Sequence, residues 1–272
     1  MLLPQSLIRL FCTFVSVITP TLRKMKAVLR LIYSVYFVLI AAPLFALSTV
    51  VFGLMVMALA LLGEWGKRVA YIPGVWWARS GIILSLCRVQ VVGREHYHPE
   101  RTPYVVMANH QGAFDILMMY GYLNIPFRWV MKASLRKVPV LGKACASAGF
   151  IFLDRGSAAS IKKSITEAQQ DLGKGVSIFI FPEGSRTATG KLNSFKKGGF
   201  IMAEALRVAV LPVVISGSFK VMPRTDRFPI PHPGKLRLEI LPEIHPNQFA
   251  QEENPLEGLR REVFRAIAAK VQ

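Results

Sequence analysis

The feature that most constrains this chain is a run of 33 residues, 31–63, without a charged side chain. A helix needs about 20 apolar residues to cross the hydrocarbon core of a bilayer, so this run is long enough to span one. We therefore expect residues 1–72 to form apolar N-terminal helices that anchor the chain in a membrane. A cleaved signal peptide is the alternative, but the run is too long for one and lacks a clean small-residue cleavage site.

Basic residues flank this run on both sides. Five of them and no acid lie within residues 1–30, and Lys67, Arg68 and Arg79 follow the run. Cytoplasmic segments of membrane proteins are enriched in Lys and Arg. Both flanks are therefore expected on the cytoplasmic side of the membrane.

Two topologies fit these flanks. A helical hairpin that dips into the bilayer returns both ends to one side, and Pro43 and Gly53 are its predicted break points. A single tilted span is the alternative, because 33 residues also suit one long helix. The apolar residues 1–20 are left unassigned.

The chain is strongly basic. Lys and Arg outnumber Asp and Glu by 34 to 16, a formal charge of +18. This favours an anionic partner, which is a phospholipid headgroup, a phosphorylated substrate or nucleic acid. Cys12, Cys87 and Cys145 lie far apart and without CxxC spacing, so neither a zinc site nor a disulfide framework is predicted.

Beyond residue 72 the sequence pattern changes. Short β-branched runs alternate with helical stretches, which predicts an α/β domain over residues 73–272 with a central, mostly parallel sheet flanked by helices. Strands are expected at residues 104–108, 128–131, 150–153, 176–181, 210–216 and 236–240. Helices are expected at residues 73–89, 113–122, 141–148, 158–172, 200–206 and 256–271, and a long surface loop at 221–234.

The first candidate motif is Asn-His-Gln-Gly-Ala-Phe-Asp at residues 109–115, where a strand passes into a helix. Histidine can accept a proton from an alcohol near neutral pH, so His110 is a candidate general base, with Asp115 to hold its tautomer. Five residues correspond to about 500° of helix rotation, so contact between the two requires the turn that Gly112 permits. A structural histidine is the alternative, because such a pair also arises by chance.

The second motif is Phe-Pro-Glu-Gly-Ser-Arg-Thr at residues 181–187, directly after another apolar strand. Gly184 helps to end the strand and frees backbone amides, and Arg186 offers a planar guanidinium to phosphate oxygens. A carboxylate would repel a phosphate, so Glu183 is expected to fix Arg186, Ser185 or a substrate hydroxyl. A turn with a solvated run of charge is the alternative.

Further cations follow other strands. Lys132 comes directly after one, and Arg155 ends the segment Gly-Phe-Ile-Phe-Leu-Asp-Arg at residues 149–155. The carboxyl ends of parallel strands share one edge of a sheet. The cations Lys132, Arg155 and Arg186 are therefore expected to converge there with His110.

Together these segments resemble the glycerolipid acyltransferases, and most closely the bacterial 1-acyl-sn-glycerol-3-phosphate acyltransferases. The resemblance covers roughly residues 89–217. It rests on four blocks in the family's order: NHxxxxD at 109–115, a GxxFxDR-like block at 149–155, FPEGxR at 181–186 and an apolar block with proline at 210–213. The apolar residues before Met25 depart from the family pattern.

The resemblance implies an α/β domain with an N-terminal helical membrane motif. It implies transfer of a fatty-acyl group from acyl-CoA or acyl carrier protein, as co-substrate, to the free hydroxyl of lysophosphatidic acid, a membrane lipid. It also implies that His110 is the general base, that Asp115 orients it, and that Arg155 and the segment from Glu183 to Arg186 bind the acceptor's phosphate. We expect Lys132 to join these phosphate ligands.

In the expected mechanism, His110 removes the proton as the acceptor oxygen attacks the thioester carbonyl, without an ester to the enzyme. Backbone amides near Gly112 or Gly184 are expected to stabilise the oxyanion. No metal or other cofactor is expected, because a thioester leaves readily. The expected partners are the lipid, the acyl carrier and an anionic membrane surface, and not nucleic acid.

Three alternatives stay open at this point. A hydrolase could use the same pair of residues to activate water, and a nonenzymatic protein that binds lipid or nucleic acid would also explain the charge. Within the transferases, glycerol-3-phosphate or another lysophospholipid could be the acceptor.

Overall fold

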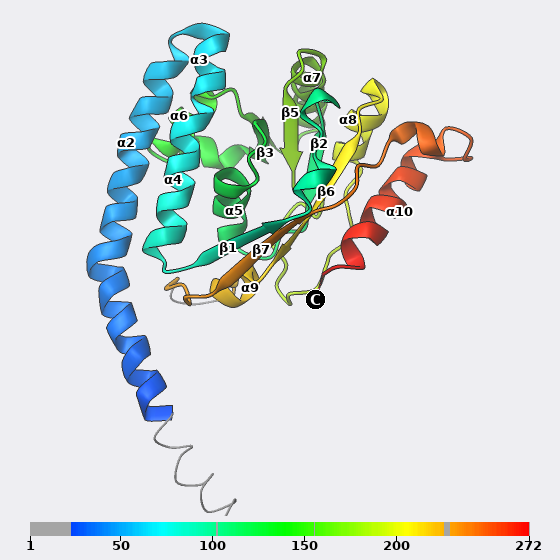
Figure 1. The fold of residues 1–272 in the computed structure, drawn as a ribbon. Helices are drawn as coiled ribbons and strands as arrows, with labels where there is room; N and C mark the ends of the chain where they lie inside the picture. The colour runs from blue at the N-terminus through cyan, green and yellow to red at the C-terminus, as the bar shows by residue number, and fades with distance from the viewer. Residues whose placement is uncertain (1–22, 102, 155, 226–228, 272) are drawn as a thin grey trace, which may run out of the picture. The chain divides into compact units, whose positions relative to one another are not determined.

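The computed structural model describes residues 23–101, 103–154, 156–225 and 229–271 (Figure 1). Residues 1–20, Cys12 and Arg155, on which expectations were placed, lie outside these ranges. The chain divides into two compact units, Met1–Leu44 and Phe45–Gln272. The predicted functional division at residue 72 stays a prediction.

One continuous helix, Arg23–Ala60, is long and apolar enough to cross a membrane. It runs through both Pro43 and Gly53, so these predicted break points are wrong. A π-helical turn, η1 (Phe37–Ala41), precedes the proline, and the amide of Ala42 there donates to the carbonyl five residues back. Proline crowds the preceding helical turn and has no amide hydrogen, and this wider turn lets the helix continue past it.

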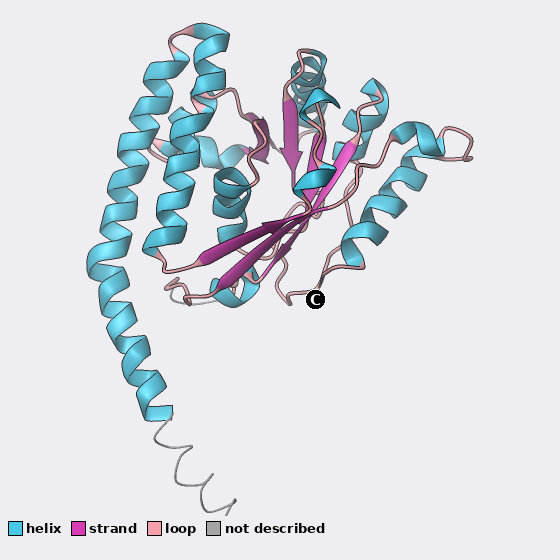
Figure 2. Cartoon of the chain, in the orientation of Figure 1, coloured by secondary structure: helices cyan, strands magenta, loops and turns pink. Residues whose placement is uncertain are grey.

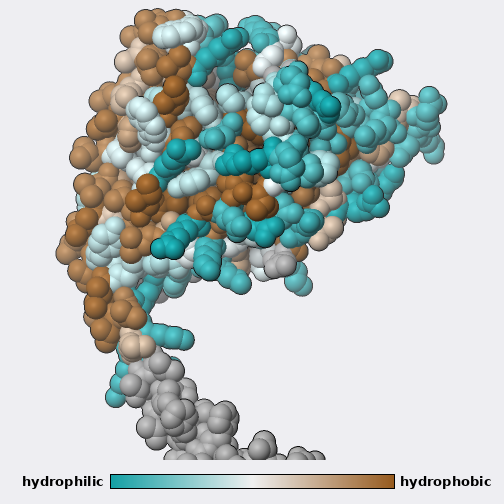
Figure 3. Space-filling view, in the orientation of Figure 1, coloured by the Kyte–Doolittle hydropathy of each residue, from teal (hydrophilic) through white to brown (hydrophobic). Residues whose placement is uncertain are grey.

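The chain doubles back after this helix. Its last part, α2 (Ala42–Ala60), is followed by α3 (Gly63–Val69) and α4 (Tyr71–Leu84). The Phe45 ring stacks on Trp77 with centroids 5.5 Å apart. The Trp77 indole N–H also donates to Thr49 Oγ1 at 2.9 Å. Large apolar side chains on the outer surface of these helices are exposed (Figure 3): Leu47, Val50, Val51, Leu54, Trp65, Ile72, Trp76 and Ile83.

The predicted helix 73–89 extends too far at its carboxyl end. The helix ends at Leu84, because Leu86 adopts a left-handed conformation with φ 53° and the amide of Cys87 turns back to the carbonyl of Ile82. The chain then enters β1 (Arg88–Val92), an edge strand that was not assigned from the sequence.

Seven strands form one sheet in the order β1-β7-β6-β2-β5-β3-β4 (Figure 2). The other six strands are β2 (Val105–Ala108), β3 (Phe127–Lys132), β4 (Ile151–Leu153), β5 (Ser177–Ile180), β6 (Val210–Ser216) and β7 (Lys235–Ile240). Every neighbouring pair is parallel except β6 and β7. The predicted mostly parallel sheet flanked by helices is therefore confirmed.

Apart from one short helix after β6, which was not expected, the helices of this domain match the expected segments closely. They are α5 (Phe114–Tyr122), α6 (Leu141–Ser147), α7 (Ala158–Gly173), α8 (Gly198–Leu206), α9 (Ser218–Val221) and α10 (Pro255–Ala268). Short helical turns are η2 (Arg94–His96), η3 (Pro99–Arg101), η4 (Ala133–Lys137) and η5 (Pro246–Phe249). Val221 belongs to α9, and the other described residues of the predicted loop 221–234 are irregular; residues 226–228 lie outside the described ranges.

The sheet separates two apolar cores. Along β2, Val106 and Ala108 face the core that includes α4 and α5, whereas Val105 and Met107 face the core that includes α7, α8 and α10. This alternation follows from the two-residue period of a strand. Because both faces are covered, the edges of the sheet at the strand ends remain available for a site.

A half-buried carboxylate near the start of β2 gives the fold a pH dependence. Burial disfavours ionisation of Glu243, but hydrogen bonds from Tyr104 (2.7 Å), Arg101 (2.6 Å) and His245 (3.1 Å) lower its pKa from 4.5 to about 2. The stabilisation is therefore present in full above pH 4.5 and is lost as the pH falls toward 2.

We expect Glu243→Gln to flatten the decline of unfolding free energy over this acid range. At pH 7 the substitution is expected to lower that free energy by about 2 kcal/mol, because charged hydrogen bonds become neutral ones. Denaturant titration followed by circular dichroism at a series of pH values measures both effects. If the unfolding free energy of the variant declined with falling pH as steeply as that of the wild type, Glu243 would not be the group responsible.

Candidate active site

Three adjacent strands end at one edge of the sheet, and each is followed by a predicted site segment. Strands β2, β5 and β3 are neighbours and mutually parallel. His110 follows β2, residues 181–187 follow β5, and Lys132 ends β3. The topology thus brings these segments to the same carboxyl edge, as the strand pattern predicted.

His110 and Asp115 are in contact. His110 Nδ1 lies 2.8 Å from Oδ2 of the fully buried Asp115. The same oxygen accepts the backbone amides of Gln111 at 2.6 Å and Gly112 at 2.8 Å. The turn is tight, since a Cβ on Gly112 would lie 2.9 Å from the carbonyl oxygen of Ser218. A carboxylate acceptor assigns the proton to Nδ1, which leaves Nε2 as the basic nitrogen.

The loop after β5 holds the backbone of His110 on both sides. The amide of His110 donates to Glu183 Oε1 at 2.6 Å, and its carbonyl accepts from the amide of Thr187 at 2.9 Å. The other oxygen of Glu183 accepts from the amide of Asn193 at 2.8 Å. Burial raises the pKa of Glu183, although the amide bonds oppose this shift. The carboxyl group therefore joins the two motifs through main-chain contacts.

Two further side chains fix the histidine and were not identified from the sequence. The imidazole stacks on the ring of Phe181, with centroids 3.8 Å apart and planes 6° apart. Asn109 exchanges hydrogen bonds of 2.9 and 2.7 Å with the backbone of Ile215 in β6. The available signal was that the two motifs themselves begin with an amide residue, Asn109, and an aromatic residue, Phe181.

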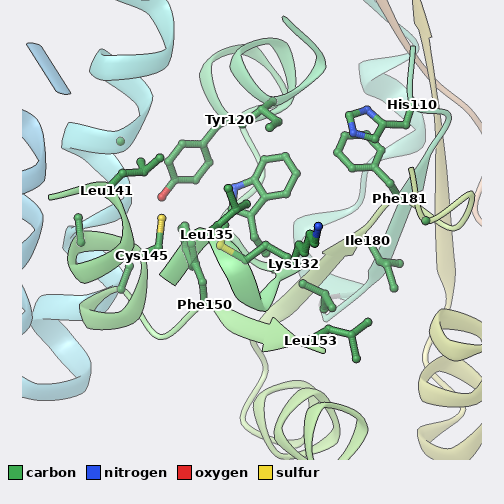
Figure 4. Close-up of a pocket in the computed structure, with 18 of the residues that line it drawn as sticks. His110, Tyr120, Lys132, Leu135, Leu141, Cys145, Phe150, Leu153, Ile180 and Phe181 are labelled. Atoms are coloured by element: carbon green, nitrogen blue, oxygen red, sulfur yellow. The ribbon is translucent and has the colours of Figure 1, made fainter. Parts of the chain in front are cut away.

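A cavity of about 630 Å³ is lined in part by His110 (Figure 4). The ring of His110 lies beside Phe181 in one part of this wall, and Tyr120, Leu141 and Cys145 lie in another (Figure 4). Most of the lining is apolar and comes from α2, α4, α5, α6 and strands β3 to β5. A cavity of this size and lining suits a long apolar group with one polar, reacting end.

The predicted phosphate ligands are placed unequally. Lys132, Gly184 and Ser185 line the cavity, and Lys132 is exposed. Arg186 is half-buried, is not part of that lining, and has no carboxylate partner among the described residues. Its expected contact with Glu183 is not formed, because both oxygens of that carboxylate accept backbone amides.

The placement of the site leaves the expected phosphate ligands and the expected oxyanion amides near Gly112 or Gly184 as predictions. Arg155 lies outside the described residues, and the roles of the cations in binding phosphate stay predictions. The amide of Gly112 is used by Asp115, and the amide of Gly184 donates to the carbonyl of Phe181 at 3.0 Å. Neither amide is therefore free for an oxyanion.

A basic imidazole at the wall of a long apolar cavity can activate a hydroxyl or a water against an acyl group. This arrangement is typical of enzymes that act on lipids. Similarity to known proteins identifies the class more closely.

Residues 88–216 match the family model described as Acyltransferase. Curated relatives include the chloroplastic 1-acyl-sn-glycerol-3-phosphate acyltransferase LPAT1 of Arabidopsis thaliana, 33% identical over 64% of this chain and 48% of the relative. The human 1-acyl-sn-glycerol-3-phosphate acyltransferase alpha is 32% identical over 68% of this chain and 61% of the relative. The chain thus spans roughly half to two thirds of the length of these relatives.

A solved structure shows the same architecture. The 1-acyl-sn-glycerophosphate (LPA) acyltransferase PlsC from Thermotoga maritima aligns with a TM-score of 0.73 and 27% sequence identity. The alignment covers 90% of this chain and 95% of that chain. These similarities in sequence and fold confirm the resemblance that the motifs of residues 88–216 predicted.

Proposed function

We propose that this protein is a membrane-associated enzyme that transfers a fatty-acyl group to the sn-2 hydroxyl of 1-acyl-glycerol-3-phosphate, giving phosphatidic acid in phospholipid biosynthesis. The observation that carries this proposal is the contact between His110 and Asp115 at the wall of the apolar cavity. The activities for which the curated relatives and the Thermotoga maritima enzyme are named support it.

In the proposed reaction, Nε2 of His110 removes the proton from the acceptor hydroxyl as its oxygen attacks the thioester carbonyl. Asp115 accepts the hydrogen bond from Nδ1 at 2.8 Å and stabilises the imidazolium that forms. The carbon–sulfur bond then breaks, and the proton held by His110 passes to the leaving thiolate. The proposal includes no metal or other cofactor, because a thioester is already an activated acyl group.

The acceptor's phosphate is assigned to Lys132, Arg155 and Arg186, with the segment from Glu183 to Ser185 positioning it. Cations that hold the phosphate orient the acceptor hydroxyl toward the base, so their main effect is on positioning. The backbone amide of Ser185, directly after Gly184, is the proposed hydrogen-bond donor to the oxyanion, because it has no acceptor among the described residues.

The membrane supplies one substrate and the aqueous phase the other. A lysophospholipid resides in the bilayer, whereas acyl-CoA and acyl carrier protein, the two candidate donors, are soluble. The apolar helix Arg23–Ala60 and the charge of +18 would hold the domain against an anionic bilayer, with the catalytic domain on the cytoplasmic face of the inner membrane.

The test is an assay of the purified full chain with a panel of lysophospholipids and glycerol-3-phosphate, each with acyl-CoA and with acyl carrier protein thioesters. Formation of phosphatidic acid from 1-acyl-glycerol-3-phosphate supports the proposal. Release of free fatty acid without transfer would show a hydrolase instead. Failure with every phosphate-bearing acceptor would remove the assignment of the cations.

We propose that the acyl chain lies in the apolar cavity lined by His110, and this location gives a separate prediction. Cys145 lines the cavity at a distance from His110 and is buried (Figure 4). Cys145→Phe adds volume there, so we expect the preferred acyl chain to become shorter by several carbons, with shorter chains transferred at near wild-type rates. Competition between acyl donors of different length measures the shift. Cys87→Phe, outside the cavity lining, is the comparison, and an unchanged chain preference would contradict the placement.

A further inference from the structure

A second cavity, of about 370 Å³, lies at the opposite edge of the sheet from His110. Its lining includes residues at the amino ends of β3 and β5, namely Phe127 and Val176, and residues of α3 and α4. The carboxyl ends of the same strands carry the candidate active site. The second cavity therefore opens away from the catalytic edge, although Tyr120, Ala148 and Phe150 line both cavities.

The lining of the second cavity is cationic. Lys67, Arg68, Arg128 and Lys174 all contribute to it. Two carboxylates neutralise part of this charge: Glu64 bonds to Lys67 at 2.6 Å and to Arg128 at 3.0 Å, and Asp171 also pairs with Arg128. Arg68 and Lys174 are exposed and have no carboxylate partner among the described residues. Two positive charges thus remain for a ligand.

A buried hydroxyl also lacks a partner there. The Tyr71 hydroxyl is buried and makes no hydrogen bond among the described residues. The Tyr71 ring is fixed between Tyr120, at 5.1 Å, and Phe127, at 6.3 Å between centroids. Burial raises the pKa of Tyr71, so the hydroxyl keeps its proton and can donate it to an anion. A buried polar group without a partner is rare in proteins and indicates a missing ligand or water.

We propose that the second cavity binds a phosphate group, with Arg68 and Lys174 supplying charge and the Tyr71 hydroxyl donating a hydrogen bond. A phosphate offers several oxygens to such a set of donors, which a carboxylate offers less well. This proposal is independent of the acyl-transfer reaction.

The surroundings favour a phosphate carried by a lipid. Leu61, Leu62 and Trp65, at the turn before the cavity, are 87%, 60% and 64% exposed. Exposed aromatic and apolar side chains beside cations are typical of the bilayer interface, where headgroup phosphates lie. Free phosphate has the same recognition chemistry, so the experiment includes both sources.

Binding is measured on the full chain in detergent micelles, with Lys132→Ala and Arg186→Ala introduced to weaken phosphate binding at the catalytic edge. Isothermal titration uses dihexanoyl phosphatidic acid in one arm and inorganic phosphate in the other. In this background we expect one remaining site. Adding Arg68→Ala and Lys174→Ala should weaken it by about tenfold or more, because two charge-assisted contacts are lost.

The matched control adds Lys162→Ala and Lys235→Ala, which remove two exposed cations outside the second cavity. This control is expected to bind as the background protein does. Tyr71→Phe should also weaken binding, by about fivefold, and it breaks no hydrogen bond among the described residues, so folding is preserved.

Occupancy by the lipid alone identifies a headgroup as the ligand, and occupancy by both probes shows that phosphate suffices. Either result supports the site. Absence of binding in the background protein, or equal affinity after removal of Arg68 and Lys174, would overturn it. A failed acyl-transfer assay leaves this test unaffected, because no step in it requires turnover.

Discussion

Replacement of His110 by alanine is expected to lower the turnover of acyl transfer by about 1,000-fold, because general-base catalysis contributes about 10²–10⁴-fold. The imidazole is the basic group at the cavity wall, and its side chain is 14% exposed. Binding of the lysophospholipid should change little, since its phosphate is assigned to cations on other segments. Initial rates under saturating substrate, with lipid binding measured separately, resolve the two effects.

His96→Ala is the matched control for this experiment. His96 lies in η2 and outside the cavity lining, so its removal should leave the turnover unchanged. If His110→Ala retained more than a tenth of wild-type turnover, the assignment of the general base would be wrong.

Replacement of Asp115 by asparagine is expected to lower turnover by about 100-fold or more, because the charge that stabilises the imidazolium is removed. An amide of the same shape presents only one oxygen, and Oδ2 now accepts three hydrogen bonds, from the His110 ring and the amides of Gln111 and Gly112. The stability of the turn should also fall. Turnover and the thermal midpoint are therefore measured together.

The double variant separates catalysis from structure. If Asp115 acts through the imidazole, then Asp115→Asn should reduce turnover little further once His110 has been replaced by alanine. Fully multiplicative losses would instead indicate that the carboxylate serves the reaction by another route.

The sequence predicted the site best where a motif follows a strand. His110 and residues 181–187 each follow an apolar strand, so parallel pairing brings them together without any knowledge of side-chain contacts. The same argument placed Lys132 at this edge. Strand bounds were correct to within about two residues because β-branched runs end at clear turn signals.

Other features depend on contacts that no local pattern encodes. Glu183 accepts a hydrogen bond from the backbone amide of His110, 73 residues away. Because almost every residue has a backbone amide, the sequence does not indicate which one is the partner. Helix α4 ends before the predicted residue 89 because Leu86 adopts a left-handed conformation, which a leucine in the sequence does not suggest. The sequence left a break at Pro43 and one continuous helix as alternatives, because it does not show the π-helical turn that accommodates the proline.

The two-sided hold on His110 has a consequence for recombination between related sequences. Glu183 and Thr187, from one loop, bind the amide and the carbonyl of the same residue, and Phe181 supports its ring. A chimaera with its crossover between residues 115 and 181 takes the base from one parent and its support from the other. Such hybrids should lose function more often than hybrids with crossovers after residue 187, even when every catalytic side chain is retained.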